Sequence, residues 1–164
     1  MQHVLANLKQ KALAKREQFQ RFFQQLRMHK PADLDAQFER FHQEAFKRID
    51  CLTCANCCKT TSPLFTNRDI KVLSKHLRLT ENEFIQTYLK VDEDGDYVFR
   101  ETPCPFLQAD NKCLVYDYRP NACREYPHTN QRKMHTIFKE TLENSAVCPA
   151  VFEVVEKLKA HYKY

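Results

Sequence analysis

The chain has 164 residues, with 43% hydrophobic, 12% aromatic and 29% charged side chains. This length and composition are typical of a globular protein, and no stretch approaches the ~20 consecutive apolar residues of a membrane-spanning helix. The net charge of +5 is mild. The basic excess lies mostly in the first fifty residues, where solvated helix faces explain it better than nucleic-acid binding.

The first residues contain neither the apolar core nor the small-residue cleavage site of a secretory signal. We therefore expect a cytoplasmic protein that does not associate with membranes. Eight cysteines are present, and the reducing pools of the cytosol would keep them as thiols. Four disulfides are the alternative, but such frameworks belong to small exported chains.

Two amphipathic helices are predicted before the first cysteine. Apolar residues from Val4 to Met28 recur at spacings of three and four, and Lys30-Pro31 ends this helix. Asp33 is a good residue to cap the second helix, whose apolar stripe continues to Ile49. The short link predicts an antiparallel helical hairpin over residues 1–50, which could bind a protein partner.

Short elements are predicted after the first cysteines. Thr66 and Thr80 each begin a capping signal for a short helix. Asp94-Gly95 between apolar runs predicts a β-hairpin. A second hairpin is predicted with Cys104 and Cys113 on its two arms.

Two more helical segments follow. A brief helical turn carries Cys123, and Pro149 opens a final helix. Cys148 then precedes a helix N-terminus, whose dipole favours a thiolate. The expected fold is mainly helical α+β: the helical hairpin over 1–50, and a metal-organised cysteine-rich domain over 51–164 with short β-hairpins and a C-terminal helix.

Four thiols lie within eight residues, in the segment CLTCANCC from Cys51 to Cys58. Thiolates are soft ligands that suit zinc or iron-sulfur clusters. The spacing of Cys51, Cys54 and Cys57 matches the three-cysteine run of bacterial ferredoxins, which a remote cysteine followed by proline completes. Both Cys104-Pro105 and Cys148-Pro149 offer that arrangement.

Zinc is the alternative, because four thiolates from two separate pairs satisfy one tetrahedral ion and eight cysteines divide into two such sites. Zinc-binding turns commonly use a glycine, but the only glycine here is Gly95. Asn56 could supply the left-handed residue instead. The side chain of Cys58 diverges from that of Cys57, so Cys58 serves a second site, bridges two metals or is a buried structural thiol.

Basic residues near the cysteines could offset the negative charge of a thiolate centre. Lys59, Arg119 and Arg124 are placed in the sequence for this role. Surface or carboxylate pairing is the alternative for Arg119. The candidate metal ligands are the eight cysteines: Cys51, Cys54, Cys57, Cys58, Cys104, Cys113, Cys123 and Cys148.

Four motifs follow one another from about Cys51 to Pro149: CxxCxxCC, CPFL, CLVYDYRPNACREYP and a final CP. In this order they resemble the YkgJ-type cysteine-cluster proteins, a zinc- or iron-chelating family. The resemblance implies metal binding by all eight cysteines, with Arg119, Pro120 and Arg124 as companions in the motif. Flagellin lysine methylases carry a similar cluster, used for an iron-sulfur centre. This chain is much shorter and has no evident methyl-donor site, so methylase activity is not implied.

We therefore expect a cytoplasmic metal-binding protein whose cysteines hold an iron-sulfur centre, such as a 4Fe-4S cluster, or one to two zinc ions. Its role would be in redox chemistry, metal handling or structure. One alternative is an iron-sulfur enzyme with an open metal site for an unknown substrate. Another is a zinc-stapled interaction module that binds a protein partner through the N-terminal hairpin.

Overall fold

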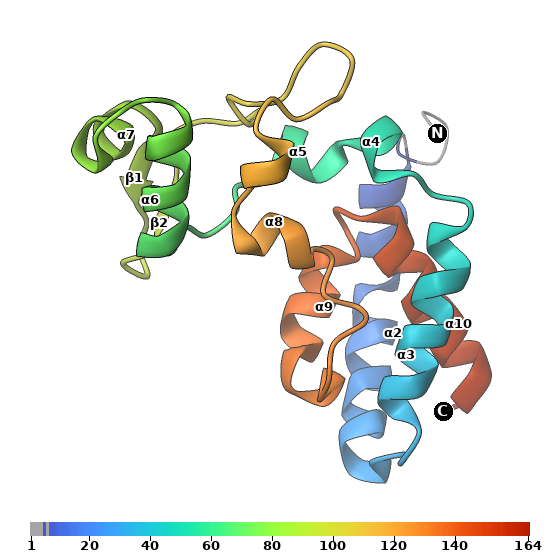
Figure 1. Cartoon of the computed structure of the whole chain (residues 1–164). Helices are drawn as coiled ribbons and strands as arrows, with labels where there is room; N and C mark the ends of the chain where they lie inside the picture. Colours follow the sequence, from blue (N-terminus) through green and yellow to red (C-terminus); the bar gives the residue numbers. More distant parts are fainter. Residues whose placement is uncertain (1–4, 6) are drawn as a thin grey trace. The chain divides into compact units, whose positions relative to one another are not determined.

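A computed structural model of the chain describes residue 5 and residues 7–164 (Figure 1). The predicted helix start at Val4 lies outside the described residues. The predicted mainly helical α+β class is confirmed. The helices are α2 (Leu8–His29), α3 (Leu34–Phe46), α4 (Cys51–Cys54), α5 (Asn56–Thr60), α6 (Asn67–His76), α7 (Glu81–Tyr88), η1 (Tyr116–Tyr118), α8 (Asn121–Glu125), η2 (Met134–Ile137), α9 (Phe138–Asn144) and α10 (Pro149–Tyr162), and the strands are β1 (Leu89–Val91) and β2 (Tyr97–Phe99).

The described chain forms two compact units. The terminal unit contains the described part of Met1–Cys54 together with Pro127–Tyr164, and the central unit is Ala55–Tyr126. Within the terminal unit, α3 packs against α10, and α2 packs against α9 and α10. The domain division at residues 1–50 and 51–164 stays a prediction. Among the described helices, none combines the length and the apolar character needed to cross a lipid bilayer.

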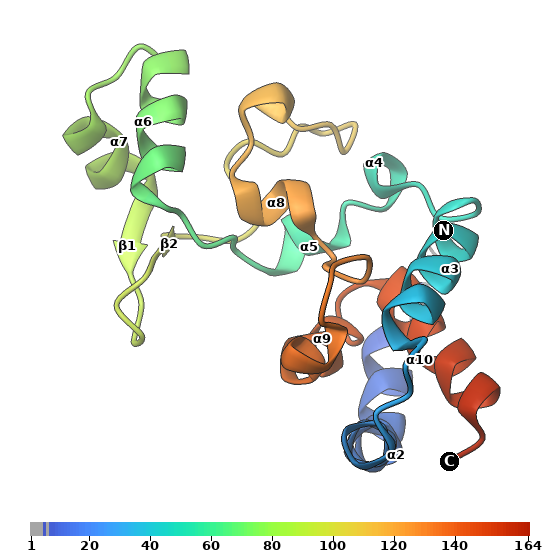
Figure 2. The same cartoon turned by 60° about the horizontal axis from the view of Figure 1, so that its bottom comes forward.

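Aromatic side chains join the helices of the terminal unit. Phe23 of α2 stacks on Phe138 of α9 with ring centroids 4.6 Å apart, and Phe38 of α3 stacks on the same ring at 6.4 Å. All three rings are almost fully buried. The predicted apolar seams of α2 and α3 are therefore used inside this unit, where α2, α3, α9 and α10 lie together in both views (Figure 2).

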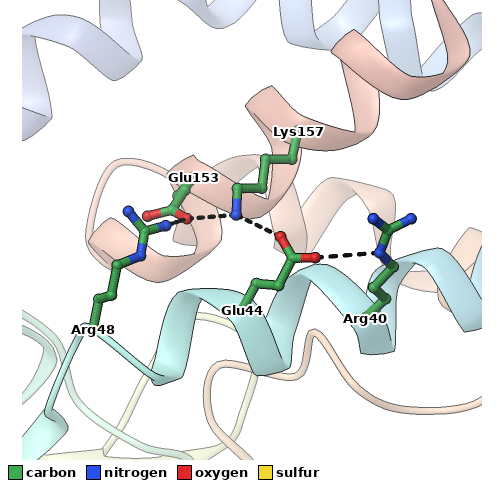
Figure 3. Close-up of polar contacts among 5 residues, drawn as sticks. All are labelled: Arg40, Glu44, Arg48, Glu153 and Lys157. Atoms are coloured by element: carbon green, nitrogen blue, oxygen red, sulfur yellow. Dashed lines mark hydrogen bonds and ion pairs between the residues drawn. The ribbon is translucent and has the colours of Figure 1, made fainter.

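Ion pairs also connect α3 to α10 in the terminal unit (Figure 3). The ammonium group of Lys157 lies 2.7 Å from the carboxylate of Glu44 and 3.1 Å from that of Glu153. Arg40 pairs with Glu44 at 3.2 Å, and Arg48 pairs with Glu153. Because these groups are partly exposed, the network fixes the register of the two helices more than it adds stability.

Two aspartates at the start of α3 make long-range hydrogen bonds. Asp33 occupies the N-cap position of α3 as predicted but makes no side-chain capping bond; its carboxylate accepts a hydrogen bond from the Tyr162 hydroxyl at 3.0 Å. Asp35 accepts hydrogen bonds from the backbone N–H groups of Lys133 and Met134, at 2.7 and 2.9 Å. Both carboxylates therefore join the N-terminal helices to the chain after residue 127.

In the central unit, the predicted capping signals are confirmed. Thr66 and Thr80 each form a complete capping box, at the starts of α6 and α7. The predicted hairpin at Asp94-Gly95 is also confirmed, with Leu89 opposite Phe99 and Val91 opposite Tyr97. These signals succeed because they act within a few residues of chain.

One apolar core holds the helices and the hairpin of the central unit together. α6 and α7 pack on each other, and α7 runs directly into β1 (Figure 2). Two of the predicted site residues, Cys104 and Cys113, pack against this core. Its buried members are Phe65, Ile70, Leu73, Phe84, Leu89, Phe99, Phe106 and Val115.

The second predicted hairpin is reduced to one bridge. Leu107 pairs with Cys113, and the N–H of Leu114 donates to the carbonyl of Phe106 at 2.8 Å. Asn111 takes a left-handed conformation in the turn, with φ of 67°. The two cysteine arms are therefore joined as predicted, but by a tight turn instead of paired strands.

We predict that Phe84→Ala destabilises the central unit by about 3–5 kcal/mol, because the ring is fully buried and its removal leaves a cavity. Chemical denaturation followed by circular dichroism measures the loss. Thr87→Ala, an exposed change on the same helix, is the control and should alter stability little. Equal effects of the two variants would contradict the assigned core.

Candidate metal centre

The cysteine-dense segment folds as two short helices. Cys51 and Cys54 lie on α4, whereas Cys57 and Cys58 lie on α5. Between them Ala55 takes a left-handed conformation, with φ of 46°. We expected Asn56 in this role; instead, Asn56 begins α5. An L-residue with a side chain is strained in this conformation by about 1–2 kcal/mol, and nothing in the sequence signalled that alanine would adopt it.

Backbone hydrogen bonds position the later cysteines of the central unit. The N–H of Cys104 donates to the carbonyl of Cys58 at 2.7 Å, which joins α5 to the turn that carries Cys104 and Cys113 on its arms. The N–H of Cys123 donates to the carbonyl of Pro120 at 2.9 Å, at the start of α8. Cys58, Cys104, Cys113 and Cys123 thus come from a helix, the two arms of a turn and a second helix, all inside one unit.

Four thiols of the central unit influence one another electrostatically. Burial and the charges of Cys58, Cys104 and Cys113 together raise the pKa of Cys123 to about 12. Burial, with contributions from Cys58 and Cys113, raises the pKa of Cys104 to about 11. We call Cys58, Cys104, Cys113 and Cys123, which all belong to the central unit, the central thiols.

Cys58 differs from the other central thiols. The pKa of Cys58 is lowered to about 7, mainly by a hydrogen bond with the Cys57 side chain and against the opposing effect of burial. A backbone hydrogen bond and the charge of Lys59 contribute to this lowering. The charge of Lys59 therefore favours the thiolate of Cys58, which is the kind of effect predicted for this residue.

The two predicted arginines are placed differently. The charge of Arg119 favours the thiolates of Cys113 and Cys123. The guanidinium of Arg124 instead donates to the backbone carbonyls of Arg119 and Asp117, at 3.0 and 3.1 Å. Arg119 therefore contributes charge near the thiols, whereas Arg124 holds the loop that leads to α8.

The pKa of Cys148 differs from the prediction. It occupies the N-cap position of α10 as expected, yet its pKa is raised to about 12 because the thiol is buried. Hydrogen bonds from the backbone of Val151 and Ala150 lower the pKa but do not compensate for the burial. The charges of Cys51 and Cys54 contribute to the raised value. Cys51, Cys54 and Cys148 form a second set within the terminal unit, which we call the terminal thiols.

In the described structure, none of the eight cysteines forms a disulfide. In the part of the chain that the structure describes, no three Cys, His, Asp or Glu side chains converge in a ready-made metal-binding arrangement. The donor chemistry nevertheless fits zinc or an iron-sulfur cluster, since both are held by cysteine sulfur. Binding would require the thiols to lose protons and the sulfurs to turn toward a common centre.

The fold and its two sets of thiols define a cysteine-cluster protein. A comparison with protein families matches residues 50–149 to the CxxCxxCC family, described as a "putative zinc- or iron-chelating domain". The chain belongs to this family, which confirms the predicted resemblance and the predicted choice of zinc or iron. No curated protein and no solved structure shows significant similarity to the chain.

We predict that metal-free, reduced protein is alkylated by iodoacetamide at Cys58 well before Cys104 or Cys123. The thiolate is the reacting form, and only Cys58 has a pKa near 7. Its labelling rate, followed by peptide mass spectrometry, should fall as the pH drops below that value.

Lys59→Gln should slow the labelling of Cys58, since it removes a charge that favours the thiolate. Lys71→Gln, which removes an exposed charge from α6, is the matched control. Labelling of Cys123 before Cys58 would contradict the assigned pKa order.

Proposed function

We propose that the protein binds metal at two sites, one in each compact unit. The observation that carries this proposal is the distribution of the cysteines over the two units: Cys58, Cys104, Cys113 and Cys123 lie in the central unit, and Cys51, Cys54 and Cys148 lie in the terminal unit. The central thiols would be the ligands of one site and the terminal thiols the ligands of the other. All seven of these residues are among the eight predicted ligands.

For the central site we favour zinc. Four thiolates satisfy a tetrahedral zinc ion completely, and such closed sites are structural. The central thiols come from α5, the turn and α8, so one ion would tie three chain segments together. The charge of Arg119 supports this site by offsetting part of the negative charge of the thiolates.

For the terminal site we favour an iron-sulfur cluster. Cys51 and Cys54 have the spacing of the ferredoxin run, and Cys148 is followed by Pro149 as in the remote ligand of that motif. When bound, such a cluster would supply one-electron chemistry. The protein would surround Cys148 with a buried, apolar setting, which tunes the reduction potential of a cluster.

Cys57 lies in the central unit, although its spacing continues the run of Cys51 and Cys54. Its side chain hydrogen-bonds with Cys58. We therefore propose that Cys57 supports the thiolate of Cys58 and binds no metal.

The cellular role that we propose is redox chemistry or metal handling in the cytoplasm. Free thiols support this setting, because an oxidising compartment would pair them. An iron-sulfur enzyme is the second candidate, supported by the presence of only three cysteines in the described terminal unit. Three ligands leave one metal position for a substrate.

Binding of a protein partner by the N-terminal helices stays a prediction. The apolar seams of α2 and α3 are buried within the terminal unit, so a partner would have to use their outer faces. Leu13 and Met28 of α2 are exposed there, at 58% and 66%.

Serine substitutions test the two-site proposal. Cys104→Ser and Cys123→Ser should lose zinc and retain iron, whereas Cys51→Ser and Cys148→Ser should lose iron and retain zinc. Leu52→Ala, an exposed change between two of the cysteines, should retain both. Elemental analysis of the purified variants measures the outcome, and loss of both metals in every cysteine variant would favour a single shared centre.

Cys57→Ser tests this supporting role. We expect unchanged metal content with a raised pKa of Cys58, and loss of zinc or iron would contradict the assignment.

Anaerobic purification tests which metals are present. We expect a brown protein with broad visible absorption that contains iron, acid-labile sulfide and zinc, because iron-sulfur clusters absorb visible light and zinc does not. A colourless protein that contains zinc alone would exclude the iron-sulfur part of the proposal and leave two zinc sites.

A further inference from the structure

A pocket of about 480 Å³ lies inside the central unit, between the first turns of α6 and the segment from η1 to α8. This volume falls in the range of sites for small molecules. The residues that line it all belong to the central unit, and none is a cysteine: Thr66, Arg68, Asp69, Val72, Tyr118, Arg119, Asn121 and Arg124.

Positive charge dominates this pocket, because its lining has three guanidinium groups and one carboxylate. The carboxylate of Asp69 is already engaged. One oxygen accepts from the N–H and hydroxyl of Thr66, and the other accepts from the N–H of Asn121 at 3.0 Å. Within the described residues, none of the three arginines forms an ion pair with a carboxylate.

Two of these arginines are held in place by neighbouring groups. The guanidinium of Arg119 lies over the Tyr116 ring at 3.9 Å and donates to the Tyr116 carbonyl. Arg124 is fixed by its bonds to the carbonyls of Arg119 and Asp117. A guanidinium has five N–H donors, so both groups retain donors for a ligand. Ordered arginines lose less conformational entropy when they bind.

Arg68 completes the pocket from α6. In the part of the chain that the structure describes, its side chain has no hydrogen bond or ion pair, and the residue is exposed. Removing this side chain would therefore change the pocket's charge without breaking a contact of the fold.

The rest of the lining is less polar. Val72 and Tyr118 contribute apolar surface, and the Tyr118 ring is stacked on His76 with centroids 3.9 Å apart. Such a wall suits a planar or apolar group attached to an anion.

We propose that this pocket binds a small organic oxyanion, a phosphate monoester or a carboxylate, through Arg68, Arg119 and Arg124. Phosphate and carboxylate oxygens match the fork of a guanidinium group, which donates two parallel hydrogen bonds to them. The wall of Val72 and Tyr118 would contact the organic part. None of the lining residues is a cysteine, but Arg119 also contributes charge near the central thiols.

Isothermal titration calorimetry on the metal-loaded protein tests the proposal, at constant ionic strength. Inorganic phosphate, phenyl phosphate and benzoate are the probes. Phenyl phosphate or benzoate should bind at one site per chain, and tighter than inorganic phosphate. A preference for one of the two identifies the oxyanion.

Arg68→Gln should weaken that binding about tenfold or more, the usual effect of losing a hydrogen bond to a charged group. Arg100→Gln is the matched control, since it removes the same charge from an exposed residue outside the lining. It should bind as the unchanged protein does. Circular dichroism and metal content should be the same for both variants.

Arg119→Gln provides a second test at the opposite side of the pocket and should also weaken binding. The proposal is overturned if neither organic probe binds. It is also overturned if Arg68→Gln binds as tightly as the unchanged protein, or if Arg100→Gln weakens binding as much. Normal metal content with no anion binding would reject this pocket alone and leave the two metal sites standing.

Discussion

The burial of sulfur against apolar side chains is the constraint on which the site depends. Cys104 and Cys113 pack against the same core as Phe84 and Phe99, and Cys148 is almost completely buried. A buried thiol stays protonated, because the charged form loses its solvation. A metal ion reverses this preference by replacing the proton. For the metal sites that we propose, folding, ionisation and metal binding would therefore be one linked equilibrium.

Local signals in the sequence predicted much of the fold. The capping boxes at Thr66 and Thr80 and the turn at Asp94-Gly95 depend on interactions across two to four residues. The caps and the turn are visible in a single sequence because their interacting residues lie close together in the chain. The cysteines and the choice of zinc or iron were predicted instead from the spacing of a family motif.

The features that the sequence did not predict depend on long-range packing. The apolar stripe on α3 predicted a helix but did not predict that α10 packs against it. Periodicity indicates which face of a helix is buried but not which element buries it. The dipole at α10 suggested an ionised Cys148, whereas the tertiary structure buries that thiol. The arginine pocket was also missed. Arg68 and Arg119 are fifty-one positions apart, and only the fold of the central unit places them around one space.

The hydrogen bond from the N–H of Cys104 to the carbonyl of Cys58 has a consequence for affinity. It holds two potential ligands, forty-six positions apart in the chain, in a fixed backbone relation before any ion arrives. Each sulfur then meets a metal held by the other at a high effective concentration, as in a chelating agent with a short linker. Selectivity among ions would then depend on how well each accepts this preset spacing, since the backbone resists adjustment.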